Sequence, residues 1–342
     1  MRWARLIALT ASMAMSAPAH SQTTHSVLDW SDLQDWTSDN HAAALDVFLK
    51  TCTDLTDDEW VKICAVAHDA KDARAFFESL FLPVLIEDDR EALFTGYYEP
   101  ELRGSLTPTE AFRFPIYRKP PEVKAGTKWY SRGEIEKNEI LAGRGLEIAW
   151  VDNPVDAFFL QIQGSGRISL VDGGKLRVGY GGRNGHKYRS VGQELIRRGI
   201  FAPHQVSARV IRNWVGRNPD EGQALLHHNP SFIFFREVSE VPAAEGPLGA
   251  MNRSVTALRS IAVDPSVVPL GAPVWIEKDG KSPLRRLMVA QDTGSAIKGA
   301  QRADIFYGTG PDAGLAAGSV RDPGRMIVLL PIKTAYQLAS GG

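Results

Sequence analysis

The stretch Val289–Gly310, VAQDTGSAIKGAQRADIFYGTG, holds two aspartates among glycine, alanine and small polar residues. Asp292 follows the apolar run Leu287–Gln291, which is typical of a buried strand, and opens a glycine turn. Asp304 lies in an alternating run, which places it on the same strand face as Phe306. An aromatic ring beside a carboxyl excludes water and raises the pKa of the acid. The stretch therefore predicts two strand-borne aspartates, of which Asp304 suits a general acid.

A third aspartate, Asp264, ends the apolar run Ser260–Val263 and precedes Pro265. Taken alone, it is an ordinary turn residue. The triplet Asp-Thr-Gly at 292–294 is also the signature of aspartic proteases, whose chemistry needs two carboxylates that share a proton. Because the chain carries one such triplet and no Asp-Ser-Gly, a protease is kept only as an alternative.

Composition restricts the class of protein. With 342 residues, 44% of them hydrophobic and 23% charged, the chain can bury one large core or two medium ones. Lys and Arg are scattered, so we expect no nucleic acid partner. No run after the N-terminus is long enough for a transmembrane segment. The histidine spacings and glycine-rich segments match no metal or nucleotide motif, so no metal and no cofactor are expected.

The N-terminus has the pattern of an export signal. Arg2 and Arg5 precede the apolar run Leu6–Met15, and the small-residue site Ala17–Ala19 follows. This pattern predicts a signal peptide over residues 1–19, cleaved after Ala19. No cysteine lies near that site, so we expect a periplasmic protein without a lipid anchor.

The two cysteines of the chain, Cys52 and Cys64, are expected to form a disulfide because an exported protein meets an oxidising compartment. The alternative is two free buried thiols. They lie in the region 41–82, where apolar residues repeat at helical spacing. Within it, Thr56–Glu59 fits a capping box at the start of a second helix.

Outside this helical region, the chain is dominated by short strand-like runs broken by glycine and proline. Two further helices are expected at 190–198 and 207–217. Polar loops near 101–111 and 237–247 are the best candidates for domain boundaries. Such punctuation favours a barrel or sandwich. The expected strands are Leu93–Tyr98, Ala157–Gln163, Phe232–Arg236, Ser260–Val263, Pro273–Ile276, Leu287–Gln291 and Met326–Leu330.

Several long motifs accompany the aspartates in a fixed order. They are FTGYYEPEL (94–102), YSRGEI (130–135), AWVDNPVDAFFLQIQGSGRI (149–168), GYGGRNGHKYRSVG (179–192), NPSFIFFRE (229–237) and RSIAVDPSVVPLGAPVWI (259–276). From about Phe94 to Pro331, this series resembles the membrane-bound lytic murein transglycosylase A family. Several long motifs in one order make the resemblance highly specific.

The resemblance implies a mainly β fold. A double-psi β-barrel domain with a helical N-terminal part would comprise residues 20–100 and 239–342. An inserted second β domain would comprise 101–238, and a glycan strand would lie in the groove between the two. Some members of the family place the two barrel aspartates one residue closer together than here, where 304 − 292 = 12. We expect the turn at 299–301 to absorb the extra residue without changing which face Asp304 occupies.

The resemblance also implies an activity: a peptidoglycan lytic exotransglycosylase, which is a carbon–oxygen lyase. It would cleave the β-1,4 bond between N-acetylmuramic acid (MurNAc) and N-acetylglucosamine (GlcNAc) and leave a 1,6-anhydro product. Asp304 would protonate the leaving oxygen and then accept the proton of the muramyl 6-hydroxyl, with Asp292 and Asp264 positioning it and tuning its proton affinity. An internal hydroxyl nucleophile makes the second carboxylate of ordinary glycosidases dispensable.

Peptidoglycan glycan strands are the expected partner, and proteins of cell-wall synthesis or division stay open as further partners. The predicted groove is lined by Tyr97 and Tyr98 from the barrel and by Gln161, Gln163 and Ser165 from the inserted domain. Strand alternation would put the two glutamines on one face and only one of the tyrosines toward the glycan. A non-catalytic peptidoglycan-binding or expansin-like module is the non-enzymatic alternative.

Overall fold

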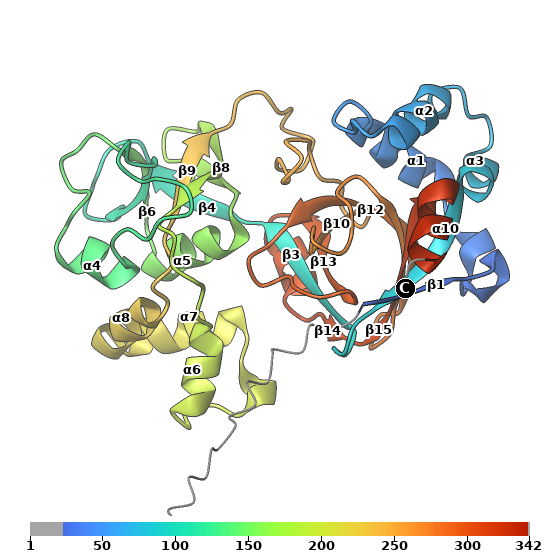
Figure 1. The fold of residues 1–342 in the computed structure, drawn as a ribbon. Coiled ribbons are helices and arrows are strands. Elements are labelled where there is room, and N and C mark those ends of the chain that lie inside the picture. The colour runs from blue at the N-terminus through green and yellow to red at the C-terminus, as the bar shows by residue number, and fades with distance from the viewer. Residues whose placement is uncertain (1–22, 341–342) are drawn as a thin grey trace, which may run out of the picture.

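The structure is a computed structural model that describes residues 23–340. The predicted signal peptide at 1–19 lies outside these residues. Two sheets organise the chain, a larger one that curls into a nearly closed barrel and a smaller one beside it (Figure 1). The chain passes from the first sheet to the second and returns, so the barrel is assembled from its two ends.

The larger sheet has the strand order β1-β2-β15-β11-β12-β10-β13-β3-β14. The pairs β10–β12 and β13–β3 are parallel, and the other pairs are antiparallel. These parallel pairs bring segments that are distant in sequence side by side at the site described below. The strands are β1 (Thr24–Val27), β2 (Phe81–Glu87), β3 (Leu93–Glu99), β10 (Ser260–Val263), β11 (Pro273–Lys278), β12 (Leu284–Thr293), β13 (Arg302–Thr309), β14 (Arg321–Asp322) and β15 (Gly324–Pro331).

Helices close the barrel on the side away from the smaller sheet (Figure 1). Buried rings of Phe48, Trp60, Phe77 and Trp275 join them to the strands in one hydrophobic core. A disulfide between Cys52 and Cys64 connects the end of α1 to α2, which confirms the predicted pairing. The helices packed on the barrel are α1 (His41–Thr51), α2 (Asp58–Ala67), α3 (Ala73–Leu80) and α10 (Ile332–Ser340), whereas α9 (Pro311–Ala317) packs on β3 and β13.

The smaller sheet has the order β5-β6-β4-β7-β8-β9 and carries its own cores. Helices pack against it and form a small bundle below it (Figure 1). The strands are β4 (Glu101–Ser105), β5 (Phe114–Tyr117), β6 (Glu147–Val151), β7 (Gly166–Leu170), β8 (Lys175–Arg183) and β9 (Ile233–Glu237), and the helices are α4 (Arg132–Lys137), α5 (Pro154–Gln163), α6 (Val191–Arg197), α7 (Ala208–Arg217) and α8 (Pro219–His228).

This architecture confirms the expected mainly β fold, with a barrel, an inserted second β domain and an N-terminal helical segment. The crossing points lie at Pro100, between β3 and β4, and in the segment 238–259, between β9 and β10. The domain limits 20–100, 101–238 and 239–342 stay a prediction.

The strand predicted at Ala157–Gln163 is wrong, because these residues belong to α5. Asn153 caps the helix through its side chain, Pro154 occupies its first turn and Gly164 ends it in a left-handed conformation. The apolar residues Val155, Phe158, Phe159 and Ile162 follow a helical spacing, which the strand interpretation overlooked.

Three smaller expectations also need correction. Asp57, not Thr56, is the N-cap of α2, and Glu59 bonds the N–H of Lys333 instead of closing a capping box. The helical region 41–82 consists of three helices and ends in β2. The first half of the polar stretch 101–111 is strand β4, because its alternate residues are buried in the second sheet.

Candidate active site

Asp304 lies on β13 with its side chain on the face opposite the barrel core. Its neighbours Ala303 and Ile305 are fully buried in that core. The Thr95 hydroxyl on β3 donates a 2.6 Å hydrogen bond to Oδ1 of Asp304, and Arg302 Nη2 donates to the Thr95 oxygen at 2.8 Å. No hydrogen bond within residues 23–340 involves Oδ2 of Asp304. One carboxyl oxygen is therefore held and the other is free to meet a ligand.

The electrostatics of Asp304 favour its protonated form. Burial raises the pKa of the carboxyl, and the Thr95 hydrogen bond and the charge of Arg302 only partly oppose this. The predicted face is also correct, because Phe306 is buried two residues further along the same strand. A carboxyl that stays protonated nearer neutral pH can act as a general acid.

Asp292 lies near the end of β12, and both of its oxygens are engaged. Oδ1 accepts from the backbone N–H of Ala250 at 3.0 Å and of Thr293 at 2.8 Å, and Oδ2 accepts from the Tyr97 hydroxyl at 3.0 Å. The pKa of Asp292 is raised to about 6, because burial and, to a lesser extent, the charge of Asp304 outweigh the hydrogen bonds, which lower it. Asp292 is thus a fixed carboxyl that titrates near neutrality.

The sheet places these two aspartates on either side of one residue. Ala262 of β10 is the register partner of Asp292 on β12 and of Asp304 on β13. Two inter-strand spacings put their Cα atoms roughly 10 Å apart. The Tyr97 hydroxyl donates to Asp292, and burial and then the charges of both aspartates raise the pKa of this hydroxyl.

Asp264 makes a different set of contacts. It is 5% exposed and accepts hydrogen bonds from Ser266, from the Lys298 ammonium at 3.2 Å and from the Gly299 N–H at 3.1 Å. Burial opposes ionisation, but these donors outweigh it and lower the pKa of Asp264. Asp264 therefore holds the loop that joins Asp292 to Asp304, and its predicted part in catalysis would act through that loop.

The two tyrosines of β3 point to opposite faces. Tyr97 faces the aspartates, and its ring packs against Phe306 at 5.2 Å between centroids. Tyr98 packs on α9, where a Cβ at Gly314 would come within 2.8 Å of its ring. This arrangement fits the expectation that only one of the two would face a glycan.

Of the residues predicted from the second domain, Gln163 lies at the junction with the barrel. Its Oε1 accepts from the backbone N–H of Tyr98 at 3.2 Å, which ties the end of α5 to β3. Ser165 follows it and is buried. Gln163 thus contacts the strand that carries Tyr97, and the role of both residues toward a glycan stays a prediction.

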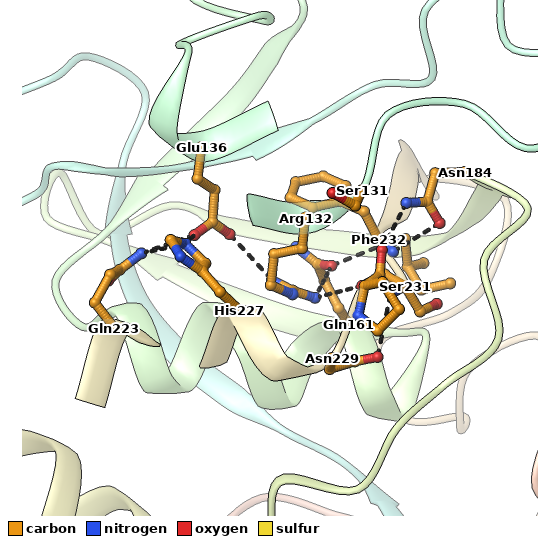
Figure 2. A network of polar contacts seen from close by, with 12 residues as sticks. Ser131, Arg132, Glu136, Gln161, Asn184, Gln223, His227, Asn229, Ser231 and Phe232 are labelled. Atoms are coloured by element: carbon orange, nitrogen blue, oxygen red, sulfur yellow. Dashed lines mark hydrogen bonds and ion pairs between the residues drawn. The ribbon is translucent and has the colours of Figure 1, made fainter. Parts of the chain in front are cut away.

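Gln161 is buried within the second domain. Figure 2 shows its Oε1 accepting from Arg132 Nη2 at 2.7 Å, and it also accepts from the Ile233 N–H at 3.0 Å. The Arg132 guanidinium lies over the rings of Phe158 and Phe232. It also donates to the Ser231 carbonyl (Figure 2). These contacts give Gln161 a structural role, and a role in sugar binding stays a prediction.

Sequence reasoning missed the buried carboxylate Glu99, which joins the two domains. Its Oε2 accepts from Arg167 Nε at 2.8 Å and from the Thr309 hydroxyl at 2.8 Å, and Arg177 Nε lies 2.9 Å from Oε1. Both arginines also donate to the carbonyl of Glu245 in the returning segment. Alternation along β3 could have indicated this residue, because Thr95, Tyr97 and Glu99 share one face.

Comparisons with known proteins match both sheets of the chain to one family. Residues 93–236 match the MltA specific insert domain and residues 259–330 match the 3D domain. Membrane-bound lytic murein transglycosylase A of Escherichia coli (strain K12) is 38% identical over 264 residues, which cover 72% of this chain and 68% of that protein. The chain belongs to the membrane-bound lytic murein transglycosylase A family.

Solved structures of the family share the fold. A membrane-bound lytic murein transglycosylase from Agrobacterium tumefaciens superposes with a TM-score of 0.84 at 32% identity, covering 92% of this chain and 99% of that one. E. coli MltA with bound chitohexaose gives a TM-score of 0.73 at 30% identity, covering 90% and 94%.

The loop between Asp292 and Asp304 leads into β13. Residues 299–301 form a bend and a turn before β13 begins at Arg302, and the position of the extra residue within this loop stays a prediction. Between residues 23 and 340, no three His, Cys, Asp or Glu side chains are grouped so as to hold a metal ion. In the same range no helix has both the length and the apolar character needed to cross a bilayer.

Proposed function

We propose that Asp304 is the general acid and base of this lytic transglycosylase, which cleaves the MurNAc–GlcNAc bond of peptidoglycan. This assignment rests on the contrast between the two aspartates whose pKa is raised by burial. Oδ2 of Asp304 makes no hydrogen bond within residues 23–340, whereas both oxygens of Asp292 are engaged. Asp304 can therefore reach a glycosidic oxygen without breaking protein contacts.

In the first step, protonated Asp304 donates its proton to the glycosidic oxygen as the bond to the muramyl C1 breaks. The muramyl 6-hydroxyl then attacks C1, and the Asp304 carboxylate accepts the hydroxyl proton. The products are a free GlcNAc 4-hydroxyl and a 1,6-anhydromuramyl end, and the aspartate is regenerated in its protonated form. No water enters, so the step needs no second carboxylate to activate one.

Asp292 and Tyr97 support this cycle without transferring a proton to the substrate. The repulsion between the two carboxyls, which raises the pKa of Asp292, disfavours a state in which both are ionised. Because burial raises the pKa of Asp304, activity is expected to favour mildly acidic conditions. Asp264 contributes by holding the loop that precedes β13.

The glycan is proposed to lie along the face that carries Asp304 and Tyr97, with Gln163 and Ser165 from the second domain near it. Amide groups and aromatic rings are suitable partners for sugar hydroxyls and ring faces. Tyr98 and Gln161 are proposed to act on the far side of this surface, by fixing α9 and α5 in place.

We further propose that the protein works in the periplasm. The predicted signal peptide supports this location, and the relatives are named membrane-bound. Cell fractionation tests this location. A periplasmic protein is expected in the soluble periplasmic fraction, and a protein attached to the outer membrane is expected in the membrane fraction.

The deciding experiment incubates the protein with purified sacculi and identifies soluble products by mass spectrometry. The proposed function predicts muropeptides that end in 1,6-anhydromuramic acid. Binding to sacculi without release of sugar would instead identify a non-catalytic or expansin-like module. Release of peptides alone would identify a protease.

A further inference from the structure

A cavity of about 530 Å³ lies beside the catalytic face, between the end of β13 and the returning segment 243–257. Both domains line it. Phe306, Gly308 and Thr309 come from the barrel, Arg167 comes from β7 of the second sheet, and Lys50 comes from α1. This cavity is separate from the hydrogen bonds that hold the aspartates, and the mechanism above leaves it without a role.

Strand β13 links the cavity to Asp304, which is not itself among the residues that line it. Phe306 forms part of its wall and lies on the same face as Asp304, two residues away, with the Tyr97 ring against it. Gly308 lies four residues beyond Asp304, which corresponds to roughly 13 Å along β13. A chain of about this length could therefore occupy the cavity while its other end is attached to a sugar near Asp304.

Arg167 gives the cavity a fixed positive charge. Its side chain is 18% exposed, with Nε bonded to Glu99 and Nη2 to the Glu245 carbonyl, and no hydrogen bond within the described residues uses Nη1. Two arginines share the single carboxylate of Glu99, so this cluster carries a net charge of about +1. The guanidinium is thus pre-organised, and within the described residues the N–H groups on Nη1 remain available to donate to a ligand.

The rim of the cavity carries charges of both signs. The Lys50 ammonium is only loosely held, 3.4 Å from the Thr256 hydroxyl and 4.0 Å from the Glu245 carboxylate, and its side chain is 38% exposed. Glu245 also accepts from the Ser254 hydroxyl. A ligand with carboxylates and an ammonium group would find a complementary partner for each.

We propose that this cavity binds the peptide stem that the muramyl lactyl group carries, with Arg167 and Lys50 receiving its carboxylates and Glu245 its amino group. The inference rests on the proposed function, because it requires a muramyl residue near Asp304. Four extended residues span roughly 13 Å, which matches the distance from Asp304 to the cavity. A stem on a sugar at the acid can therefore reach the charged groups.

The test compares two substrates that differ only in the stem. Soluble glycan strands with tetrapeptide stems and the same strands stripped by an amidase are each digested, and the ratio of their kcat/KM values is measured. Lys50→Met and Ala244→Trp, which places a ring in the cavity from the exposed segment, are expected to lower this ratio roughly 3- to 10-fold. Lys62→Met, at an exposed position on α2, is the control and should leave the ratio unchanged.

An unchanged ratio in both cavity variants would overturn the proposal. A second measurement does not depend on catalysis: binding of a muramyl tripeptide to the Asp304→Asn protein, followed by NMR. The proposal predicts binding that Ala244→Trp weakens by the same factor, and absence of binding overturns it. If the wild type formed no anhydro product, the proposed function would fail, while the tripeptide measurement would still decide the cavity.

Discussion

The carboxyl of Asp292 is held in the folded protein at an energetic cost that asparagine would remove. Its oxygens accept from the N–H groups of Ala250 and Thr293 and from the Tyr97 hydroxyl. In Asp292→Asn, the amide oxygen can keep both backbone donors, and Nδ2 can donate to the tyrosine oxygen. The substitution therefore removes the negative charge and keeps the hydrogen-bonding pattern.

The magnitude follows from the pKa of Asp292, which burial raises from 3.8 to about 6. At about 1.36 kcal/mol per pH unit, the ionised carboxylate costs the folded state about 3 kcal/mol. Because the folded state binds the proton more tightly than the unfolded chain, stability falls as pH rises from about 4 to about 6. The free energy of unfolding of Asp292→Asn is thus expected to exceed that of the wild type by up to about 3 kcal/mol at pH 8 and to match it near pH 4.

Urea unfolding at pH 4 and pH 8, followed by tryptophan fluorescence, measures this difference. Asp69→Asn, a substitution of an exposed aspartate after α2, controls for the loss of one charge. A gain that is equal at both pH values would refute the reasoning, because it would not depend on ionisation. A variant that is less stable than the wild type at pH 8 would also refute it.

Three further predictions concern the surrounding structure. Asp264→Asn should change the free energy of unfolding in the opposite direction. The lowered pKa of the Asp264 carboxyl stabilises the folded state above the unfolded pKa, so the variant should lose stability at pH 7, and the loss should shrink toward pH 3 in the same assay. The double variant Cys52→Ala/Cys64→Ala should lower the free energy of unfolding by about 3 kcal/mol, because the disulfide closes a 12-residue separation; an unchanged value contradicts this. Gln163→Ala should weaken glycan binding roughly 3- to 10-fold in a pull-down with sacculi and cost about 1 kcal/mol of stability for the lost Tyr98 contact; unchanged binding would remove it from the site.

Much of the barrel was predictable because its strands are short apolar runs with clear punctuation. The runs ending in Asp264 and Asp292 and the alternation around Asp304 locate all three aspartates at or within strands, as the structure has them. What alternation cannot supply is the pairing of distant strands. The contact of Asp304 with Thr95 depends on the parallel pairing of β13 with β3, which are separated by more than two hundred residues.

The second domain was harder to predict because its helices are short. Around Gln161, the helical spacing of the apolar residues and the cap at Asn153 were the signals, and the alternation of Gln161 and Gln163 obscured them. The partners of Glu99 could not be inferred either. Its arginines come from β7 and β8, and only the folded sheet brings them to the end of β3.

The central claim is that a single free carboxyl, Asp304, transfers the proton. Activity of Asp304→Asn on sacculi, measured as release of 1,6-anhydromuropeptides, tests this most directly, with binding to sacculi recorded in parallel. We predict a loss at or beyond the upper end of about 100- to 10,000-fold with binding retained, and a smaller loss for Asp292→Asn. Residual activity above roughly a tenth of the wild type would contradict the assignment. Products with reducing muramic acid would contradict the mechanism, because water would then be the nucleophile.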